Sequence, residues 1–218
     1  MNDRANIRRL EDWRRAQGHS FPEQMDAEVK LGPIYSDSWL RDPKHLVFAL
    51  SRYKFVSKML SGCGHVAEVG AGDGFGSEIV KQEVRSLTLY DLSPLREGIE
   101  YYDVMATPIN HPEPYDAIYA LDIMEHVKSG EVFFRNLTNS LSDHGKLIVG
   151  IPSLEGQTYA SEPSRKLHIN CMSGEALRAL ALRFFRHVFM FGQNDETIHT
   201  GFLPMAHYLW AVAAEPIR

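Results

Sequence analysis

A glycine-rich turn between an apolar run and a helix-forming run is the first feature of this sequence that could bind a ligand. The stretch VAEVGAGDGFGSEIV covers residues 66–80 and has glycines at positions 70, 72, 74 and 76. A nicotinamide or flavin site requires the spacing G-x-G-x-x-G, and Phe75 stands where the third glycine would be. Asp73 lies inside the turn, where its charge would repel a pyrophosphate at the start of the following helix. The turn therefore favours a ligand without phosphate.

Carboxylates around this turn indicate which groups such a ligand carries. Asp91 ends the run SLTLYD, 21 residues after Gly70, where a carboxylate can accept hydrogen bonds from two ribose hydroxyls. Asp103, in EYYDV, would follow a third strand and could accept from an exocyclic amine such as that of adenine. Glu68 and Asp73 remain for a cationic group. A positively charged nucleoside without phosphate is indicated, and S-adenosylmethionine meets these conditions.

Over residues 62–152 the sequence resembles the class I S-adenosylmethionine-dependent methyltransferases, in particular small stand-alone bacterial ones. The resemblance rests on EVGAGDGFG, Asp91, Asp103 and YDAIYALDIMEHV. It implies that the glycine turn approaches the methionine part of the donor, that Asp91 binds ribose, and that Asp103 lies near adenine. It also implies that an early helix covers the donor. The cofactor-binding residues expected on this basis are Glu68, Gly70, Ala71, Gly72, Asp73, Gly74, Asp91, Leu92, Asp103, Val104, Leu121, Arg52 and Tyr53.

The same resemblance implies a small-molecule acceptor and release of S-adenosylhomocysteine. RYKFVSKML and HTGFLPMAHYL are similar to stretches of bacterial methyltransferases that modify surface polysaccharides or their activated precursors, which implies O-methylation of a saccharide. N-methylation of a small amine is the competing enzymatic interpretation. A nicotinamide-dependent oxidoreductase and a non-catalytic nucleoside-binding protein are the alternatives from other classes, and Phe75 and Asp73 disfavour the oxidoreductase.

Three histidines are candidates for the catalytic base that a hydroxyl acceptor requires, because histidine titrates near neutral pH. His168 lies in the polar loop SEPSRKLHINCMSGEAL, which is long enough to cover a pocket, and it is the first choice. His126 lies in LDIMEHV, and His199 lies in TIHTGFLPMAHYL, from where it could reach the acceptor.

A divalent metal is a further possibility at the turn after the fourth strand. Asp122, Glu125 and His126 stand at relative positions 0, 3 and 4, which places them on one face of a helical turn. This turn is similar to that of the ubiquinone-pathway O-methyltransferases and the small-RNA methyltransferases, in which related residues hold a divalent metal. With His168 they could form an oxygen and nitrogen ligand set for Mg²⁺, Mn²⁺ or Zn²⁺. The alternative is a site without a metal: in metal-free relatives, these residues line the donor pocket or cap the next helix.

The elements that must position these residues alternate between short apolar runs and helical patterns, which predicts parallel strands joined by crossover helices. Ligands of such sheets bind beyond the carboxyl ends of the strands. We expect an α/β fold, a Rossmann-like, doubly wound, mostly parallel seven-stranded sheet with an antiparallel last strand, and an N-terminal helical extension. Residues 1–61 would form this helical lid and residues 62–218 the methyltransferase domain. Strands are expected at 65–69, 86–90, 99–104, 115–121, 146–151, 187–192 and 207–214, and helices at 42–59, 75–84, 129–141 and from Ser173.

Composition limits the partners that the protein could have. The 218 residues carry a formal net charge of −5, so no basic field favours nucleic acid. No apolar stretch approaches the length of a membrane span or forms a signal-peptide core, which predicts a cytoplasmic protein. Cys63 and Cys171 lack CxxC spacing and support neither a disulfide framework nor a zinc knuckle.

Overall fold

Strand β1 (His65–Val69) lies in the interior of a sheet, because four of its five residues are buried, as in a strand that is covered on both faces. It pairs in parallel with β2 (Ser86–Asp91) on one side and with β4 (Tyr115–Leu121) on the other. The structure is a computed structural model that describes Asp12, Ala16 and residues 30–218.

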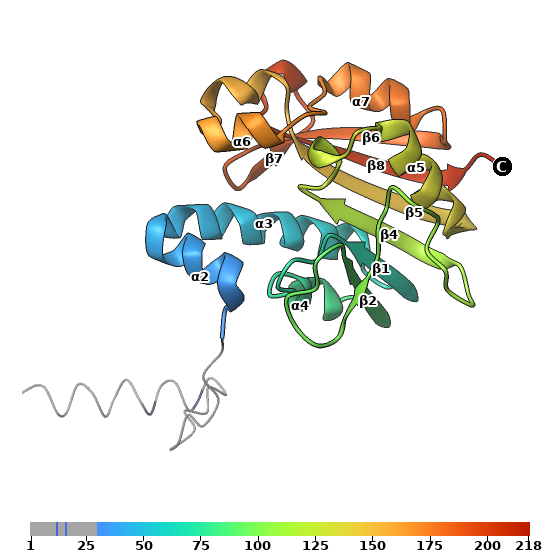
Figure 1. The fold of residues 1–218 in the computed structure, drawn as a ribbon, viewed down its shortest axis with the longest axis horizontal. Coiled ribbons are helices and arrows are strands. Elements are labelled where there is room, and N and C mark those ends of the chain that lie inside the picture. Colours follow the sequence, from blue (N-terminus) through green and yellow to red (C-terminus); the bar gives the residue numbers. More distant parts are fainter. Residues whose placement is uncertain (1–11, 13–15, 17–29) are drawn as a thin grey trace, which may run out of the picture. The chain divides into compact units, whose positions relative to one another are not determined.

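The complete sheet has the strand order β3-β2-β1-β4-β5-β8-β6-β7, as Figure 1 shows for most of its strands. Strands β1 to β5 run parallel to one another. The last strand, β8, pairs antiparallel with β5 and with β6, as expected. The remaining strands are β3 (Ile99–Tyr101), β5 (Leu141–Pro152), β6 (Phe185–Asn194), β7 (Thr197–His199) and β8 (Tyr208–Pro216).

The expected number of seven strands is wrong, because the sheet has eight. The additional strand is β7, which folds back on β6 and pairs Thr197 with Asn194 and His199 with Gly192. The reversal occurs at Asp195, which has a φ of +50°. The segment NDETIH around β7 is mostly polar and carries no alternating apolar pattern by which a strand could be recognised.

Helices begin where the sequence supplies side chains that cap their free backbone N–H groups. Asp42 caps α3 (Pro43–Met59), Ser129 caps α5 (Gly130–Asn139), and Ser173 caps α7 (Gly174–Ala181), each by accepting a hydrogen bond from a backbone N–H two or three residues ahead. Helix α4 is shorter than the expected 75–84, because residues 75–76 and 82–83 form turns at its two ends. The other helices are α2 (Gly32–Arg41), α4 (Ser77–Lys81) and α6 (Glu162–Leu167), with short 3-10 helices η1 (Met124–His126), η2 (Glu155–Tyr159) and η3 (Leu203–Met205).

Helices cover both faces of the sheet, which confirms the doubly wound architecture. Phe133 and Leu137 of α5 and Leu177 of α7 belong to the core on one face. On the other face, Phe55 of α3 packs on Trp210 of β8, with ring centroids 4.7 Å apart. Because α3 packs on this face of the sheet, its side chains can reach the carboxyl ends of the strands.

Of the expected extension at residues 1–61, the structure describes Asp12, Ala16 and residues 30–61. Gly32–Arg218 forms one compact unit, so α2 and α3 belong to the same unit as the sheet. That residues 1–61 act as a lid, and that a domain boundary follows residue 61, stay predictions. Within the described part of the chain, no helix is long and apolar enough to cross a membrane.

Candidate functional site

The glycine turn brings the backbone close to the loop that follows β4. Gly70 has a φ of +86° and Gly72 a φ of +59°, a region that side chains rarely adopt. A Cβ atom at Gly70 would overlap the side chain of Ile123. The Gly72 N–H donates a hydrogen bond of 2.8 Å to Asp91 Oδ2. The turn and the end of β2 are therefore held together by direct contact.

A first cavity of about 430 Å³ opens at the carboxyl ends of β1, β2 and β4. Two of the expected carboxylates line it, Asp91 and Asp103, and each also holds a nearby backbone N–H, from Ser93 at 2.7 Å and from Met105 at 2.8 Å. Because a carboxylate has about four acceptor positions, both can still accept hydrogen bonds from a ligand. The rest of its lining is mostly apolar: Val69, Gly70, Leu92, Tyr102, Val104, Met105, Ile123, His126, Val127 and Lys128.

A second cavity of about 300 Å³ adjoins the first, and Gly70, Asp91 and Ile123 line both. One face of α3 forms part of its wall. The second cavity is further lined by Ile34, Tyr35, Ser38, His45, Ala49, Arg52, Tyr53, Ala71, Gly72, Asp73, Leu121 and Asp122.

Glu68 is placed differently from the other expected carboxylates, because it lines neither cavity. It is 1% exposed and accepts hydrogen bonds from the hydroxyls of Tyr119 at 2.7 Å, Tyr53 at 3.1 Å and Ser77. Burial raises the pKa of the Glu68 carboxyl, although these hydroxyl bonds oppose the rise. The geometry shows a buried anchor that ties α3 and α4 to β1 and β4.

Asp73 lines the second cavity, yet its carboxylate is already bound by protein groups. Asp73 Oδ2 accepts from the backbone N–H groups of Ile34 at 3.0 Å and Tyr35 at 3.3 Å, near the start of α2. Asp73 therefore caps α2 rather than the helix that follows it in sequence. Gly74 lines neither cavity, and its carbonyl accepts a hydrogen bond of 3.2 Å from Arg96.

Arg52 and Asp122 form an ion pair in the second cavity. Arg52 Nη1 lies 2.5 Å from Asp122 Oδ2, and the Arg52 guanidinium lies 3.8 Å from the centroid of the Tyr208 ring. The Arg52 side chain is only 13% exposed. Asp122 has a φ of +57°, which turns the chain sharply at the end of β4. The pair fixes α3 to the end of that strand.

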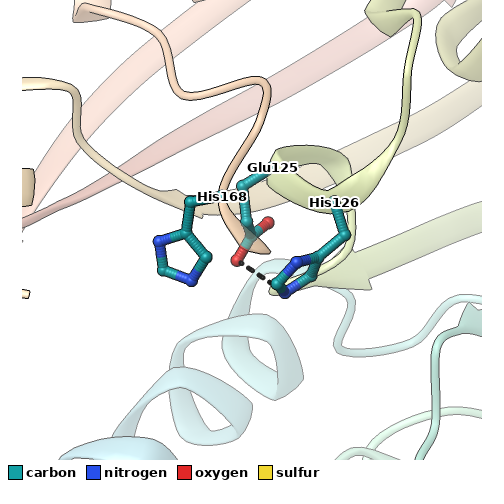
Figure 2. A group of neighbouring side chains, drawn as sticks. All are labelled: Glu125, His126 and His168. Carbon is teal, nitrogen blue, oxygen red and sulfur yellow. Dashed lines mark ion pairs between the residues drawn. The ribbon is translucent and has the colours of Figure 1, made fainter. Parts of the chain in front are cut away.

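Glu125, His126 and His168 converge, as Figure 2 shows, with one ligand atom from each lying within 4.8 Å of the others. The Glu125 side chain is 1% exposed, and neither carboxylate oxygen has a hydrogen-bond partner among the described residues. Burial, and then the charge of Asp122, raise the pKa of Glu125 to about 9. Asp122 is not part of this cluster, because its carboxylate is paired with Arg52.

The two histidines of this cluster are oriented by hydrogen bonds at their Nδ1 atoms. His126 Nδ1 lies 3.1 Å from the Leu167 carbonyl oxygen, and His168 Nδ1 lies 2.9 Å from Gln157 Oε1. Both acceptors favour the tautomer with hydrogen on Nδ1, which leaves the Nε2 lone pair free. Burial, and then the neighbouring His126, lower the pKa of His168.

His199 is separate from this arrangement. It lies on β7, the last strand of the sheet order, where its Nε2 is 3.5 Å from Asn194 Oδ1. Within the described part of the chain, neither His168 nor His199 lines the two cavities, whereas His126 lines the first. The structure therefore brings His126 and His168 together and leaves His199 elsewhere.

A family model described as a methyltransferase domain matches residues 39–195. The chain belongs to this methyltransferase-domain family. The expectation of an enzyme of the class I S-adenosylmethionine-dependent methyltransferases is thereby confirmed. A search of curated proteins found no match.

Solved structures share the fold of this methyltransferase at low sequence identity. The N-methyltransferase NodS from Bradyrhizobium japonicum WM9, in complex with S-adenosyl-L-homocysteine, is 14% identical with a TM-score of 0.57, over 95% of this chain and 98% of that one. A possible histamine N-methyltransferase from Thermotoga maritima is 18% identical with a TM-score of 0.61, over 84% and 94%. The plantazolicin methyltransferase BpumL, in complex with a monoazolic desmethylPZN analog and SAH, is 14% identical with a TM-score of 0.56, over 84% and 88%.

His45 of the methyltransferase is a site residue that the sequence analysis missed. His45, Ala49, Arg52 and Tyr53 all line the second cavity, and their relative positions 0, 4, 7 and 8 are those of one helix face. Burial, and then the charge of Arg52, lower the pKa of His45. Once Arg52 and Tyr53 are placed at the donor, the same helical spacing identifies His45 from the sequence.

Proposed function

We propose that the methyltransferase binds S-adenosylmethionine across the two adjoining cavities. The observation that carries this proposal is that Gly70, Asp91 and Ile123 line both cavities, so that one extended ligand can occupy them together. The adenosine part fits the first cavity, with Asp91 accepting from the ribose hydroxyls and Asp103 from the adenine amine. The methionine part fits the second cavity, where Gly70 and Gly72 allow the backbone to approach it closely.

Leu92, Val104 and Leu121 supply apolar surface to this donor site, since all three line one of the cavities. Ala71, Asp73, Arg52 and Tyr53 line the second cavity beside the methionine part. Glu68 and Gly74 support the site indirectly, because Glu68 anchors Tyr53 and the Gly74 carbonyl binds Arg96.

When bound, the donor supplies an electrophilic methyl group on a positively charged sulfur. The residues of this chain align the acceptor with that methyl group and exclude water from it, which is the main requirement of an in-line displacement. We propose His45 as the base for a hydroxyl acceptor, because it lines the cavity that would hold the methionine part, and because partial desolvation and then Arg52 lower the pKa of this exposed residue and favour its neutral form. His168 and His126 are proposed for a different role.

We propose that Glu125, His126 and His168 form a divalent metal site. The fit rests on the Glu125 carboxylate, which is buried without a hydrogen-bond partner among the described residues and lies 3.9 Å from His126 Nε2, and on two imidazoles whose Nδ1 contacts leave the Nε2 lone pairs available to a metal. One carboxylate and two imidazoles suit Mn²⁺ or Zn²⁺ better than Mg²⁺, which prefers oxygen ligands. A bound cation would also stabilise the ionised form of the Glu125 carboxylate, which burial disfavours.

For the reaction, we propose O-methylation of a small hydroxylated acceptor such as a saccharide. The N-methylation of a small amine remains the second candidate, and it is favoured by two neighbours of similar fold that are described as N-methyltransferases. An amine acceptor needs no base once it is neutral, so His45 would then be dispensable.

Calorimetric titration with S-adenosylhomocysteine and with NADH tests the proposed donor. We expect S-adenosylhomocysteine to bind with one site per chain and NADH not to bind. Binding of NADH alone would favour an oxidoreductase, and binding of S-adenosylhomocysteine without methyl transfer to hydroxyl or amine acceptors would favour a non-catalytic nucleoside-binding protein.

A further inference from the structure

A third cavity of about 210 Å³ lies against the second, and Arg52 is the residue that lines both. Its other residues come from α3, the end of β5, η2, β6, β8 and the connections beside them. Its volume lies below the range of about 300–1,000 Å³ for drug-sized ligands, so it has room for one small ring. The third cavity is lined by Phe48, Arg52, Pro152, Gly156, Tyr159, Ala160, Gln193, Asp195, His207 and Tyr208.

The Arg52 side chain lies between the second and the third cavity and lines both. Its guanidinium pairs with Asp122 and stacks on the ring of Tyr208, which lines the third cavity. Arg52 Nε is buried without a hydrogen-bond partner among the described residues, and so is the hydroxyl of Tyr208. Buried polar groups without partners are uncommon in folded proteins and require an explanation, such as an absent ligand or water.

The lining of the third cavity includes the aromatic ring of Tyr159 and the carboxylate of Asp195. The ring of Tyr159, which is 80% exposed, lies 5.3 Å from the ring of His207. The Asp195 carboxylate has no ion-pair or hydrogen-bond partner within residues 30–218. A flat exposed ring beside an acceptor oxygen suits a ring that carries hydroxyl or amino groups.

The Asp195 turn is held in place by Gln193, which is 1% exposed. Gln193 Nε2 donates to the Asp195 carbonyl at 2.6 Å and to Ser51 Oγ at 2.9 Å, and Gln193 Oε1 accepts from Trp210 Nε1 at 3.0 Å. These bonds tie the turn to α3 and to β8. Asp195 is therefore positioned by the core and not by the surface loop alone.

Charges around the third cavity oppose an anionic ligand. The charge of Arg52 is compensated by Asp122, and an adjoining depression that shares Phe48 and Asp195 with the third cavity also carries Asp42, Glu196 and Lys44. The depression is therefore lined by three carboxylates, Asp42, Asp195 and Glu196, and by one lysine, Lys44. A phosphate would be repelled, whereas a neutral polyol or an ammonium group would not.

We propose that the third cavity is the acceptor site and that it takes a neutral or cationic ring bearing hydroxyl or amino groups, not a phosphorylated one. This inference rests on the proposed function, because it places the acceptor beside the proposed methionine end of the donor. In the transfer, the acceptor oxygen or nitrogen forms a bond to the methyl carbon while the carbon–sulfur bond breaks. The sulfur keeps the electron pair and becomes a neutral thioether, and the proton of the acceptor passes to His45 or to water.

Three probes that share one ring and differ in charge test this inference: glucose, glucosamine and glucose 6-phosphate. Their binding is measured by saturation-transfer NMR, with and without S-adenosylhomocysteine, and the affinity for S-adenosylhomocysteine is measured by calorimetry on the same sample. We expect glucose and glucosamine to bind and glucose 6-phosphate to bind at least about ten-fold more weakly. Failure of S-adenosylhomocysteine to bind would count against the proposed donor, and the sugar signals would still report on the third cavity.

Two variants separate charge from stacking. Asp195→Asn should weaken glucosamine by about ten-fold and glucose by less, whereas Tyr159→Ala should weaken both. Asp143→Asn, at a carboxylate that is 83% exposed and pairs with Arg218, is the matched control and should change neither. Preferred binding of glucose 6-phosphate, no binding of any of the three sugars, or unchanged affinities in both test variants would each overturn the inference.

Discussion

Arg52 and Asp122 lie 2.5 Å apart, and the Arg52 guanidinium rests on the ring of Tyr208. One side chain of α3 thereby contacts the ends of β4 and β8. Because Arg52 is largely buried and Asp122 is partly exposed, removing the arginine would leave a carboxylate without a partner in the lining of the second cavity.

Replacing Arg52 by alanine should lower the free energy of unfolding by about 2 kcal/mol. Urea denaturation of the wild type and of Arg52→Ala measures this loss. The control is Arg41→Ala, because Arg41 also pairs with an aspartate at 2.7 Å but is 79% exposed. Exposed pairs of this kind contribute about 0.2–1 kcal/mol, so equal losses in the two variants would contradict the role given to Arg52.

Replacing Gly70 by alanine should destabilise the fold and abolish donor binding. Its φ of +86° disfavours any side chain, and a Cβ atom would also overlap Ile123. Gly62→Ala is a matched control, because Gly62 has a φ of +82° but no atom within 4 Å of the added Cβ. The control should lose about 1–2 kcal/mol in urea denaturation and keep its affinity for S-adenosylhomocysteine, whereas Gly70→Ala should lose more stability and the affinity.

Asp91→Ala should weaken binding of S-adenosylhomocysteine by about ten-fold to a hundred-fold, since it removes the acceptor proposed for the ribose hydroxyls and the partner of the Gly72 N–H. Calorimetric titration measures the change. The exposed Asp143→Ala serves as the control and should bind as the wild type does. An unchanged affinity in Asp91→Ala would remove this carboxylate from the donor site.

Glu125→Gln should abolish binding of Mn²⁺ or Zn²⁺, because it removes the anionic ligand while keeping the size of the side chain. Metal content after dialysis, and the d–d absorption of added Co²⁺, are readouts that do not depend on activity. His168→Gln should show the same loss, and His199→Gln, remote from the cluster, should retain the metal. Wild-type protein that binds none of these ions would refute the proposed site.

The pH dependence of stability should contain a contribution from His45, whose pKa is lowered by burial and then by Arg52. The unfolded chain takes up a proton at the ordinary histidine pKa, near 6.5, while the folded chain still resists it. Stability from this group is therefore present above pH 6.5 and is lost as the pH falls through the lower folded value. Unfolding by urea between pH 5 and 8 should show a shallower acid-side loss for His45→Asn than for the wild type.

The strands and most helices of this fold could be predicted from the sequence, because they depend on neighbours within one or two turns of chain. β1 and β4 match the apolar runs, and Ser129 and Ser173 cap the helices that they were expected to begin. The family resemblance likewise rests on a contiguous stretch. β7 was missed because it forms only by pairing with β6.

The partners of individual side chains, by contrast, depend on residues that only packing brings together. Glu68 accepts from Tyr119, 51 positions away, and Asp73 caps a helix 38 to 39 positions earlier, so neither carboxylate is left for the cation that the sequence assigned to them.

The sequence by itself determined that this chain forms a glycine turn followed by two strand-end carboxylates, because local periodicity and spacing specify such features. Only the tertiary structure decided that the face of α3 carrying His45 borders the second cavity, that His168 meets Glu125, and that His199 lies apart. These side-chain contacts depend on how α3 and the loop before α7 pack on the sheet. No local sequence pattern encodes that packing.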